Sequence, residues 1–417
     1  MHIVFVTTEL ASNNNSSGGL ASFTSNIAKI FAQQGHQVSV VLASTKNVSI
    51  EFDSNVNIYS LFVPMYKWKL MDFFSKIFGR ITREDIDEMR KMFVNLNKAR
   101  QVKKIVRNIN RRDKIDLIHY CNHGSLNLLS PEKIPYVVRI SGFLNIWNGV
   151  NVSDGSIQYT DNPLSIKDKL EEYTIKKSKY VISPSHLIAL IAKNNLGIDP
   201  VVIESPFVLE RTEWDDSILK KFVLEEKRYI IHYGRLTYLK GTHIVAQISK
   251  EFLKQHMEYY IVVSGNNLDL LETDGTKLKA EEYVKKCAGE FADRIIYVGQ
   301  LVREQLYPLI QNAQLCLLPS RIENLSNACI EAMAMGKIVV ATNGASYEQL
   351  IDDRVSGFLC ERDNPASYLK AVNEVLSMST EERDKMSLKA IEVTKRLEPQ
   401  KIYQQYLAFY EKVIREW

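Results

Sequence analysis

Two glutamates that stand eight residues apart are the most informative residues of this sequence. Glu323 and Glu331 belong to the string RIENLSNACIEAMAMGKIVVATNGA. The pattern predicts that Glu331 lies in an apolar helix and that Glu323 precedes this helix, near the backbone amides of residues 324–327. A carboxylate in a buried helix is costly unless it is paired or hydrogen-bonded, and ribose or sugar hydroxyls would satisfy it. A helix N-terminal charge and a buried ion pair would explain each glutamate singly, but they explain the whole string less well.

Two cations follow the expected strand 229–233, in the segment GRLTYLKG. Arg235 and Lys240 would lie at the carboxyl edge of a sheet, where a diphosphate leaving group needs positive charge as its bond to a sugar breaks. Two surface cations in a loop are the plain alternative. Gly234 and Gly241 bound the segment, and loops bounded in this way favour phosphate binding.

A third candidate is the glycine pair Gly18 and Gly19, which comes directly before a helix expected from about Leu20. Paired glycines allow backbone amides to approach a phosphate, although a flexible loop would show the same pair. The sequence has neither G-x-G-x-x-G nor a P-loop, so dinucleotide oxidoreductases and NTPases lose support. No D-x-D motif stands beside a strand end, and we expect neither a metal nor a cofactor.

The elements that must position these residues form two series of short, β-branched runs separated by helical patterns. Runs that are apolar on both faces and alternate with helices predict parallel sheets covered on both sides. The expected strands are 2–8, 37–43, 115–119, 135–140 and 179–183, followed by 229–233, 259–264, 294–298, 314–319 and 337–341.

Two such series predict an α/β protein with two Rossmann-like, doubly wound domains. Pro206 and the charges after it place the boundary near residues 204–216. We therefore expect domains over 1–205 and 206–398, and an aromatic-rich amphipathic helix over 399–417 that packs back on the first domain. Ligands of such sheets bind beyond the carboxyl ends of the strands, so two facing domains would share one cleft.

Composition narrows the class of protein further. The chain has 417 residues, 45% of them hydrophobic, and a formal net charge of +4, which excludes disordered and fibrous classes and does not indicate a nucleic-acid partner. Five scattered cysteines without metal-ligand spacing predict reduced core residues in a cytoplasmic protein. No stretch approaches the ~20 apolar residues that span a bilayer.

Residues 64–114 differ from their surroundings, with 15 Lys and Arg against 6 Asp and Glu. They predict an insertion of basic amphipathic helices. These helices could form a solvated pair that covers its own domain. They could also attract an anionic membrane or a lipid-linked acceptor, which would make the protein peripheral at the inner face of the membrane.

Taken together, these motifs resemble those of the retaining glycosyltransferases of family 4, the glycosyl transferases group 1, over nearly the entire chain. The resemblance implies a GT-B fold, in which two Rossmann-like domains face each other across a cleft. The E-x7-E pair with its following AMAMGKIVVAT is the most specific part. The other residues that carry the resemblance are Gly18, Gly19, Ser183 to Ser185, Gly234 to Gly241, Gly299, Pro319 and Ser320.

The resemblance also implies roles for individual residues. Arg235 and Lys240 would hold the donor diphosphate, Glu331 the ribose hydroxyls, and Glu323 the hydroxyls of the donor sugar. Gly19 would approach the diphosphate from the first domain. The full set of implied donor-binding residues is Gly18, Gly19, Gly234, Arg235, Lys240, Gly265, Glu323, Asn324, Leu325, Ser326 and Glu331.

One expected feature of that family is altered here. Family members commonly carry a histidine after the strand that corresponds to IDLIH, but this chain reads HYCNHG, with Cys121 where the second histidine would fall. We take His123 as the catalytic histidine and His119 as a core residue, although a loop of altered length would reverse this choice. Residues 139–142, RISG, replace the usual HG-type sequence, so acceptor recognition is expected to be unusual.

The expected reaction is retaining transfer of a hexose from a UDP- or GDP-sugar to a glycan, a lipid-linked acceptor or another hydroxyl, in polysaccharide or glycoconjugate biosynthesis. The catalytic residues would be His123, Glu323, Arg235 and Lys240, with the diphosphate oxygen helping to deprotonate the acceptor. An epimerase or phosphorylase on the same scaffold is one alternative. A binding or membrane-docking protein without activity is the other, and Cys121 is the residue that keeps it open.

Overall fold

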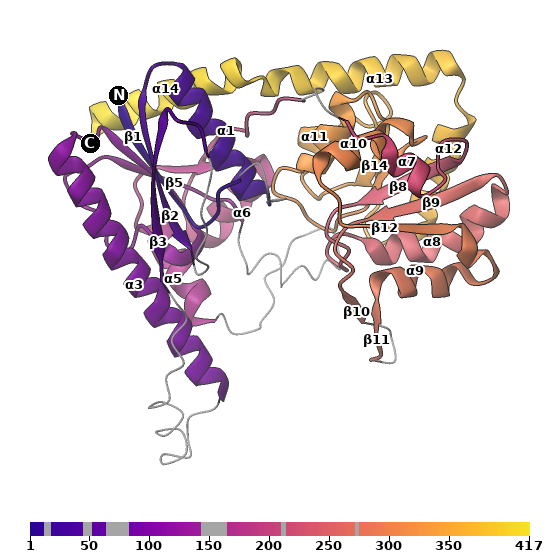
Figure 1. The fold of residues 1–417 in the computed structure, drawn as a ribbon, viewed down its shortest axis with the longest axis horizontal. Coiled ribbons are helices and arrows are strands. Elements are labelled where there is room, and N and C mark those ends of the chain that lie inside the picture. Colours follow the sequence, from indigo (N-terminus) through magenta and orange to yellow (C-terminus); the bar gives the residue numbers. More distant parts are fainter. Residues whose placement is uncertain (12–17, 45–51, 64–82, 143–164, 210–213, 272–274) are drawn as a thin grey trace. The chain divides into compact units, whose positions relative to one another are not determined.

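The computed structural model describes residues 1–11, 18–44, 52–63, 83–142, 165–209, 214–271 and 275–417. Contacts within the chain divide it into two units (Figure 1). The first comprises Met1–Pro206 and Pro399–Trp417, and the second comprises Phe207–Glu398. Each unit is built on one parallel sheet with helices between its strands, so the predicted α/β fold is confirmed. Within the described ranges, no helix has both the length and the hydropathy needed to cross a bilayer.

The first unit contains a seven-stranded sheet in the order β3-β2-β1-β4-β5-β6-β7. Strand β1 lies inside the sheet between β2 and β4, and all six of its residues are buried, which explains the apolar run at residues 3–6. The strands are β1 (His2–Thr7), β2 (Gln37–Ser44), β3 (Val56–Phe62), β4 (Leu117–Cys121), β5 (Tyr136–Arg139), β6 (Val181–Ser183) and β7 (Val201–Val202).

Helices α1 (Gly19–Gln33) and α14 (Pro399–Glu416) pack against each other in this unit. Helix α3 (Arg83–Arg112) packs against α5 (Ile166–Lys176), and α6 (His186–Leu196) follows β6. Helix α3 occupies part of the predicted basic insertion, whose residues 64–82 lie outside the described residues. Val102, Val106 and Ile109 are buried at helical spacing, so α3 serves as the crossover between β3 and β4.

The second unit contains a six-stranded sheet in the order β12-β9-β8-β13-β14-β15. Its strands are β8 (Arg228–Tyr233), β9 (Tyr259–Ser264), β12 (Ile295–Gly299), β13 (Cys316–Leu318), β14 (Val339–Thr342) and β15 (Phe358–Cys360). A separate antiparallel pair consists of β10 (Asp269–Leu271) and β11 (Lys277–Lys279). Its helices are α7 (Ser217–Lys221), α8 (Thr242–Gln255), α9 (Ala280–Ala288), α10 (Arg303–Asn312), α11 (Asn327–Ala334), α12 (Pro365–Ser377) and α13 (Thr380–Thr394).

This topology explains why the candidate residues of the second unit come together. Strands β8 and β13 are parallel neighbours in the middle of the sheet, so the loops that follow them leave the same edge. The loop after β8 contains residues 234–241, and the loop after β13 contains residues 319–326. Parallel sheets bind ligands at this edge, beyond the carboxyl ends of their strands.

Candidate functional site

The two loops at this edge are in direct backbone contact. Gly241 has a φ of +75°, and a Cβ atom built on it would lie 1.9 Å from the carbonyl oxygen of Pro319. The amide of Arg321 also donates to the carbonyl oxygen of Leu239 at 2.8 Å. The glycine that bounds the first loop is therefore required by close approach of the second loop, and this approach places Lys240 beside the residues after β13.

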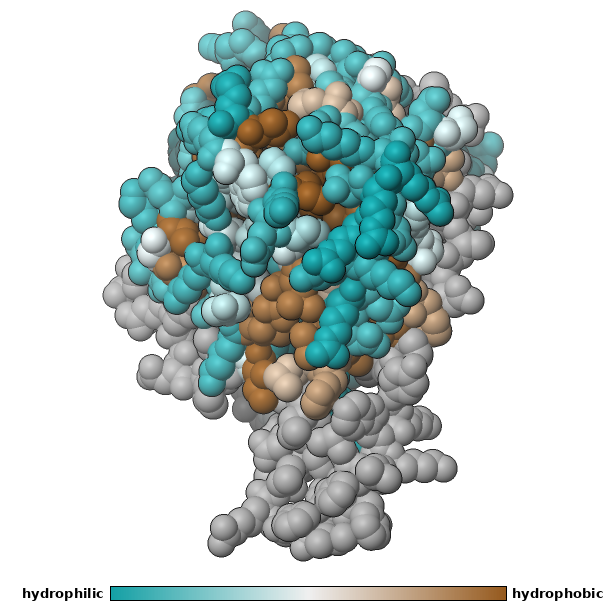
Figure 2. Space-filling view, turned by 90° about the vertical axis from the view of Figure 1, so that its left-hand side faces the viewer, coloured by the Kyte–Doolittle hydropathy of each residue, from teal (hydrophilic) through white to brown (hydrophobic). Residues whose placement is uncertain are grey.

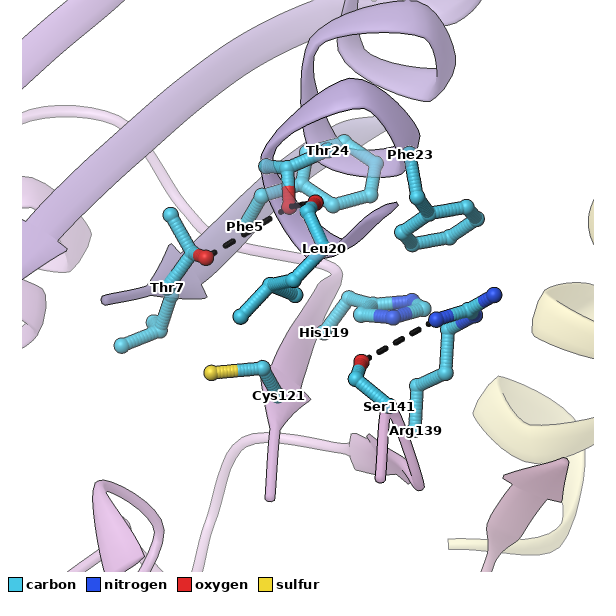
Figure 3. Close-up of a pocket in the computed structure, with 10 residues that line it drawn as sticks. Phe5, Thr7, Leu20, Phe23, Thr24, His119, Cys121, Arg139 and Ser141 are labelled. Atoms are coloured by element: carbon cyan, nitrogen blue, oxygen red, sulfur yellow. Dashed lines mark hydrogen bonds between the residues drawn. The ribbon is translucent and has the colours of Figure 1, made fainter. Parts of the chain in front are cut away.

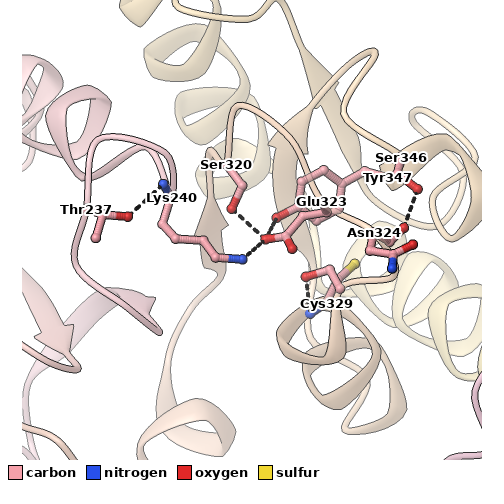
Figure 4. Close-up of polar contacts among 9 residues, drawn as sticks. Thr237, Lys240, Ser320, Glu323, Asn324, Cys329, Ser346 and Tyr347 are labelled. Atoms are coloured by element: carbon pink, nitrogen blue, oxygen red, sulfur yellow. Dashed lines mark hydrogen bonds and ion pairs between the residues drawn. The ribbon is translucent and has the colours of Figure 1, made fainter. Parts of the chain in front are cut away.

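Glu323 is the centre of a polar cluster that these loops form (Figure 4). Its Oε1 atom accepts hydrogen bonds from Lys240 Nζ at 2.5 Å, from Ser320 Oγ at 2.8 Å and from the Tyr347 hydroxyl at 3.5 Å. The side chains of Lys240 and Glu323 are 22% and 10% exposed, so this ion pair is poorly solvated but remains accessible. Charged groups in such surroundings interact more strongly with a ligand than they would in water.

Helix α11 begins next to this cluster. Ser326 is its N-cap, and the Ser326 hydroxyl accepts from the Cys329 amide at 3.3 Å. Asn324 is fixed by its carbonyl oxygen, which accepts from Ser346 Oγ at 2.7 Å. The amides at the start of a helix lack intrahelical partners and carry partial positive charge, so the first turn of α11, which follows Ser326, brings partial positive charge close to Glu323 in the chain.

Glu331 lies further along α11, is buried, and is held by helix α10. Its Oε1 atom accepts from Arg303 Nε at 3.2 Å and from the Tyr307 hydroxyl at 3.4 Å. Burial raises the pKa of the Glu331 carboxyl, while the charge of Arg303 and the hydrogen bonds from Tyr307 and Arg303 act against this rise. Glu331 therefore forms the buried ion pair that the sequence analysis gave as an alternative, and its partner is Arg303. The same carboxylate can still accept further hydrogen bonds.

The remaining candidates of the second unit lie in the same loops. Arg235 is exposed directly after β8. Gly265 follows β9, and a Cβ atom built on it would lie 1.6 Å from the carbonyl oxygen of Gly234, so these two glycines allow two loop backbones to touch. Cations, carboxylates and helix amides thus gather at one sheet edge, an arrangement able to bind a phosphorylated, hydroxyl-rich ligand.

Comparison with known proteins identifies this unit. Residues 215–393 match the family described as glycosyl transferases group 1. This range contains both loops, both glutamates and Lys240. The second unit of this chain is therefore similar to the group 1 glycosyltransferases.

Curated relatives extend the likeness beyond the second unit. The chain is 23% identical to the uncharacterised glycosyltransferase MJ1607 of Methanocaldococcus jannaschii, over 86% of this chain and 85% of that protein. It is 23% identical to an alpha-monoglucosyldiacylglycerol synthase of Streptococcus pneumoniae, over 85% of this chain and 75% of that protein. YtcC of Bacillus subtilis is 26% identical over 38% of this chain, and the match spans 39% of YtcC.

Solved structures support the fold of the whole chain. The sucrose-phosphate synthase of Thermosynechococcus elongatus covers 100% of each chain with a TM-score of 0.70 at 14% identity. Anabaena Alr3699/HepE, solved in complex with UDP-glucose, covers 99% of this chain and 100% of its own with a TM-score of 0.63 at 15% identity. The fold that the resemblance implied is confirmed.

The first unit contains the other candidates. Gly18 is the N-cap of α1, and Gly19 is its first residue. His123 opens a short 3-10 helix (His123–Ser125) after β4, and burial followed by the charge of Lys167 lowers its pKa to about 4. An imidazole in this state is neutral near pH 7 and can act as a hydrogen-bond donor or as a base.

His119 and Cys121 lie within β4 and are buried. His119 Nδ1 lies 2.6 Å from the Tyr410 hydroxyl of α14, and burial together with the charge of Arg139 lowers the pKa of His119 to about 3. Burial raises the pKa of the Cys121 thiol to about 11. The contacts of His119 tie it to the interior of the unit, whereas His123 is half-buried at the carboxyl edge of the sheet.

A small pocket lies at the carboxyl ends of β1, β4 and β5 (Figure 3). Two of the residues that line it, Arg139 and Ser141, belong to the segment that replaces the usual HG-type sequence. Arg139 lines the pocket with a buried guanidinium, whose carbon lies 3.7 Å from the Phe23 ring centroid. Arg139 also donates to Ser141 Oγ at 3.0 Å and to Ser205 Oγ at 2.8 Å. In the part of the chain that the structure describes, Arg139 has no carboxylate partner, and its charge is stabilised by hydroxyls and an aromatic face.

Four residues of the site were not assigned a role from the sequence. Ser320 and Tyr347 contact Glu323, and Arg303 and Tyr307 contact Glu331. Arg303 and Tyr307 stand four residues apart at the start of an amphipathic helix, a spacing that puts them on one face. Nothing local to that helix indicates which carboxylate they meet.

Proposed function

We propose that this protein is a glycosyltransferase that transfers a hexose, with retention at the anomeric carbon, from a nucleotide-diphosphate sugar to a hydroxyl acceptor. The observation that carries the proposal is the cluster at the carboxyl edge of the second sheet, where Lys240 meets Glu323 beside the start of α11. It combines a cation for a diphosphate, a carboxylate for sugar hydroxyls and helix amides for either group.

In this proposal each residue has a separate partner on the donor. Lys240 and the exposed Arg235 bind the diphosphate, and Glu331 accepts hydrogen bonds from the ribose hydroxyls. Glu323 and the amides of residues 324–326 bind the sugar. Gly18, Gly19, Gly234 and Gly265 keep their implied donor-binding roles as part of the proposal, and His123 is the proposed catalytic residue of the first unit.

The proposed reaction is a direct transfer on one face of the sugar. The bond between the anomeric carbon and the diphosphate oxygen breaks, and the acceptor oxygen forms the new bond to that carbon. The acceptor proton passes to the leaving diphosphate oxygen. Lys240 and Arg235 stabilise the charge that develops on the diphosphate, so a divalent ion is expected to be dispensable.

Relatives guide the choice of donor and acceptor. A structural neighbour was solved with UDP-glucose, and one relative is described as a monoglucosyldiacylglycerol synthase. We therefore propose a UDP-hexose as the first donor to test, ahead of GDP-sugars, and a glycan or lipid-linked hydroxyl as the acceptor.

A cationic stripe on α3 supports an acceptor at a membrane surface. Arg100, Lys104, Arg107 and Arg111 are exposed at spacings of four, three and four residues, which places them on one face of the helix. Among the described residues none of the four has an ion-pair partner. Figure 2 shows hydrophilic side chains next to an apolar area on the side of the molecule that carries α3. Each cation near an anionic bilayer contributes about 1 kcal/mol of attraction.

A panel of UDP-, GDP-, ADP- and dTDP-sugars tests the donor proposal by thermal stabilisation and slow donor hydrolysis. One donor should raise the melting temperature of the wild type by mass action, and Glu331→Ala and Lys240→Ala should lose this effect. Lys250→Ala is the matched control, because Lys250 is an exposed cation of the same unit that pairs with Glu290. If no nucleotide sugar stabilises the wild type, or if the control loses the effect equally, the proposal fails.

Sedimentation with anionic vesicles at low and high salt tests the membrane proposal. The triple variant R100Q/K104Q/R107Q should release the protein from the vesicles, while K250Q/K254Q/K370Q removes three exposed cations of the second unit as a control. The wild type should sediment at low salt and detach at high salt because exposed charges are screened. A wild type that ignores anionic vesicles at low salt contradicts the proposal.

A further inference from the structure

Both carboxylates of the donor site are held through a single oxygen atom. Arg303 Nε and the Tyr307 hydroxyl contact Oε1 of Glu331, and in the described ranges no hydrogen bond reaches Oε2. Glu323 shows the same layout, because its three contacts, from Lys240, Ser320 and Tyr347, all fall on Oε1. A carboxylate carries about four acceptor sites on two oxygens, so each glutamate keeps one oxygen for a ligand while the other is anchored.

The helical turn that carries Arg303 is itself fixed on another side. The Asp215 amide donates to the carbonyl oxygen of Glu304 at 2.8 Å, and the Gln305 side chain donates to the Asp215 carboxylate at 3.3 Å. The Trp214 ring packs edge-on against Tyr307 with 5.9 Å between centroids. These contacts hold the first turn of α10 against the segment that precedes α7. They therefore fix the backbone position from which the Arg303 side chain extends.

We propose that Arg303, assisted by Tyr307, is a positioning residue for donor binding that anchors Glu331 through Oε1 and leaves Oε2 for the ribose hydroxyls. The inference rests on the proposed function, since it assigns the ribose to Glu331. Arg303 touches neither the ribose nor the reacting atoms in this scheme and acts through the carboxylate.

The charge of Arg303 has a second consequence for the same carboxylate. Burial raises the pKa of Glu331, and Arg303 and Tyr307 oppose that rise. Among the described residues, Tyr233 of β8 is a further titratable group that faces Glu331, and its hydroxyl donates to the carbonyl oxygen of Ala328 at 2.5 Å. Without the Arg303 charge the pKa of Glu331 climbs further, so the ionised form that accepts strong hydrogen bonds is lost at a higher pH.

The inference predicts a change in the pH profile of nucleotide binding. The probes are UDP, GDP and ADP, and dissociation constants are measured by calorimetry from acidic to mildly alkaline pH, because a raised carboxyl pKa moves the loss of the ionised form toward neutral pH. For the diphosphate that binds the wild type best, Arg303→Gln should weaken binding about tenfold at the acidic end and much less at the alkaline end. Arg303→Lys should restore most of the affinity at low pH, and Tyr307→Phe should shift the profile less than Arg303→Gln.

Arg354→Gln is the matched control, because Arg354 and Arg303 have side chains that are 53% and 52% exposed and Arg354 pairs with Glu374 away from the site. A loss of affinity in Arg303→Gln that is equal at every pH, or a profile that matches the wild type, overturns the inference and leaves the proposed function in place. If the wild type binds none of the three diphosphates, the proposed function itself fails, and the inference fails with it.

Discussion

At the scale of single residues, the site contains charged groups that pair with one another. Its carboxylates also have oxygen atoms that remain available to a ligand. Glu323 is nearly buried, and Lys240, Ser320 and Tyr347 orient it before any ligand arrives. Preorganised groups of this kind do not have to reorient during the reaction, which makes them effective in stabilising developing charge. The cost is a poorly solvated ion pair that depends on both partners.

Removing the charge of Glu323 tests this arrangement. Glu323→Gln keeps the size of the side chain but replaces a charged acceptor by a neutral amide, so we expect kcat/KM for transfer or donor hydrolysis to fall about 100-fold. Glu374→Gln is the control, because Glu374 is a partly exposed carboxylate that pairs with Arg354. Initial rates with the selected donor decide the outcome, and equal rates for both variants would contradict a role of Glu323 in catalysis.

Gly241 tests the contact between the two loops. A methyl group there would overlap the carbonyl oxygen of Pro319, whereas a methyl group at Gly197, whose φ of +67° is similar, would meet open space. Both alanine variants carry left-handed backbone strain, but only Gly241→Ala must also push the loops apart. Urea unfolding should show an additional loss of about 1–3 kcal/mol for Gly241→Ala, together with weaker donor binding. Similar stabilities of the two variants would show that the loops move apart freely.

At the scale of elements, α14 completes the first unit through aromatic and histidine contacts. Tyr410 packs on Phe31 with 5.4 Å between centroids and bonds to His119, and Tyr403 lies 2.8 Å from His36 Nε2. Helix α14 therefore meets both α1 and the central sheet with buried polar groups that satisfy one another. Burial disfavours the charged imidazolium at both positions, so this packing is most stable with neutral imidazoles.

This preference for neutral imidazoles predicts a dependence of stability on pH. The pKa of His119 falls from its ordinary value of 6.5 to about 3 in the folded protein, and burial also lowers the pKa of His36. The unfolded chain binds a proton at His119 at a higher pH than the folded protein does. The contribution of the neutral His119 to the free energy of unfolding is therefore complete above about pH 6.5, and it falls by about 1.4 kcal/mol per pH unit as the pH falls toward 3.

Urea unfolding of the wild type and of His119→Gln, measured from neutral to acidic pH, checks this prediction. The variant should lose less stability on acidification than the wild type does. The control His186→Gln removes an exposed histidine of the same unit and should follow the wild type. A His119→Gln profile parallel to that of the wild type would show that His119 does not control the acid limit.

At the scale of the whole molecule, the chain leaves the first unit at Pro206 and returns to it at Pro399. The second unit is thus an insertion between the first sheet and the helix that completes its unit. The second unit has its own core, and it contains Lys240 and both carboxylates of the proposed donor site.

This division predicts where a bound nucleotide changes backbone protection. Hydrogen exchange followed by mass spectrometry should show slower exchange in peptides that cover residues 234–241 and 319–331 when the selected nucleoside diphosphate is present, because ligand binding suppresses local opening. Peptides from α12, at residues 365–377, provide an internal control in the same unit. Uniform slowing over the whole unit, without a maximum at the two loops, would place the nucleotide elsewhere.

The sequence by itself determined the α/β class and the positions of most strands along the chain. Buried parallel strands need apolar runs that are visible locally, so every expected strand overlaps a strand of the structure, with ends that differ by up to two residues. Strands β3, β7 and β15 of the two sheets were not expected. The same reasoning assigned Arg235, Lys240 and Glu323 to loops at strand ends, because those loops follow directly from the strand positions.

Only the tertiary structure decided which side chains meet. Glu323 pairs with Lys240 across 83 residues and with Tyr347 across 24, and Glu331 meets Arg303 across 28. It also decided that His119 bonds to Tyr410, 291 residues away. Helical and strand periodicity report the solvent-facing side of an element, whereas these contacts arise from the packing of separate elements, which leaves no periodic signal in the chain.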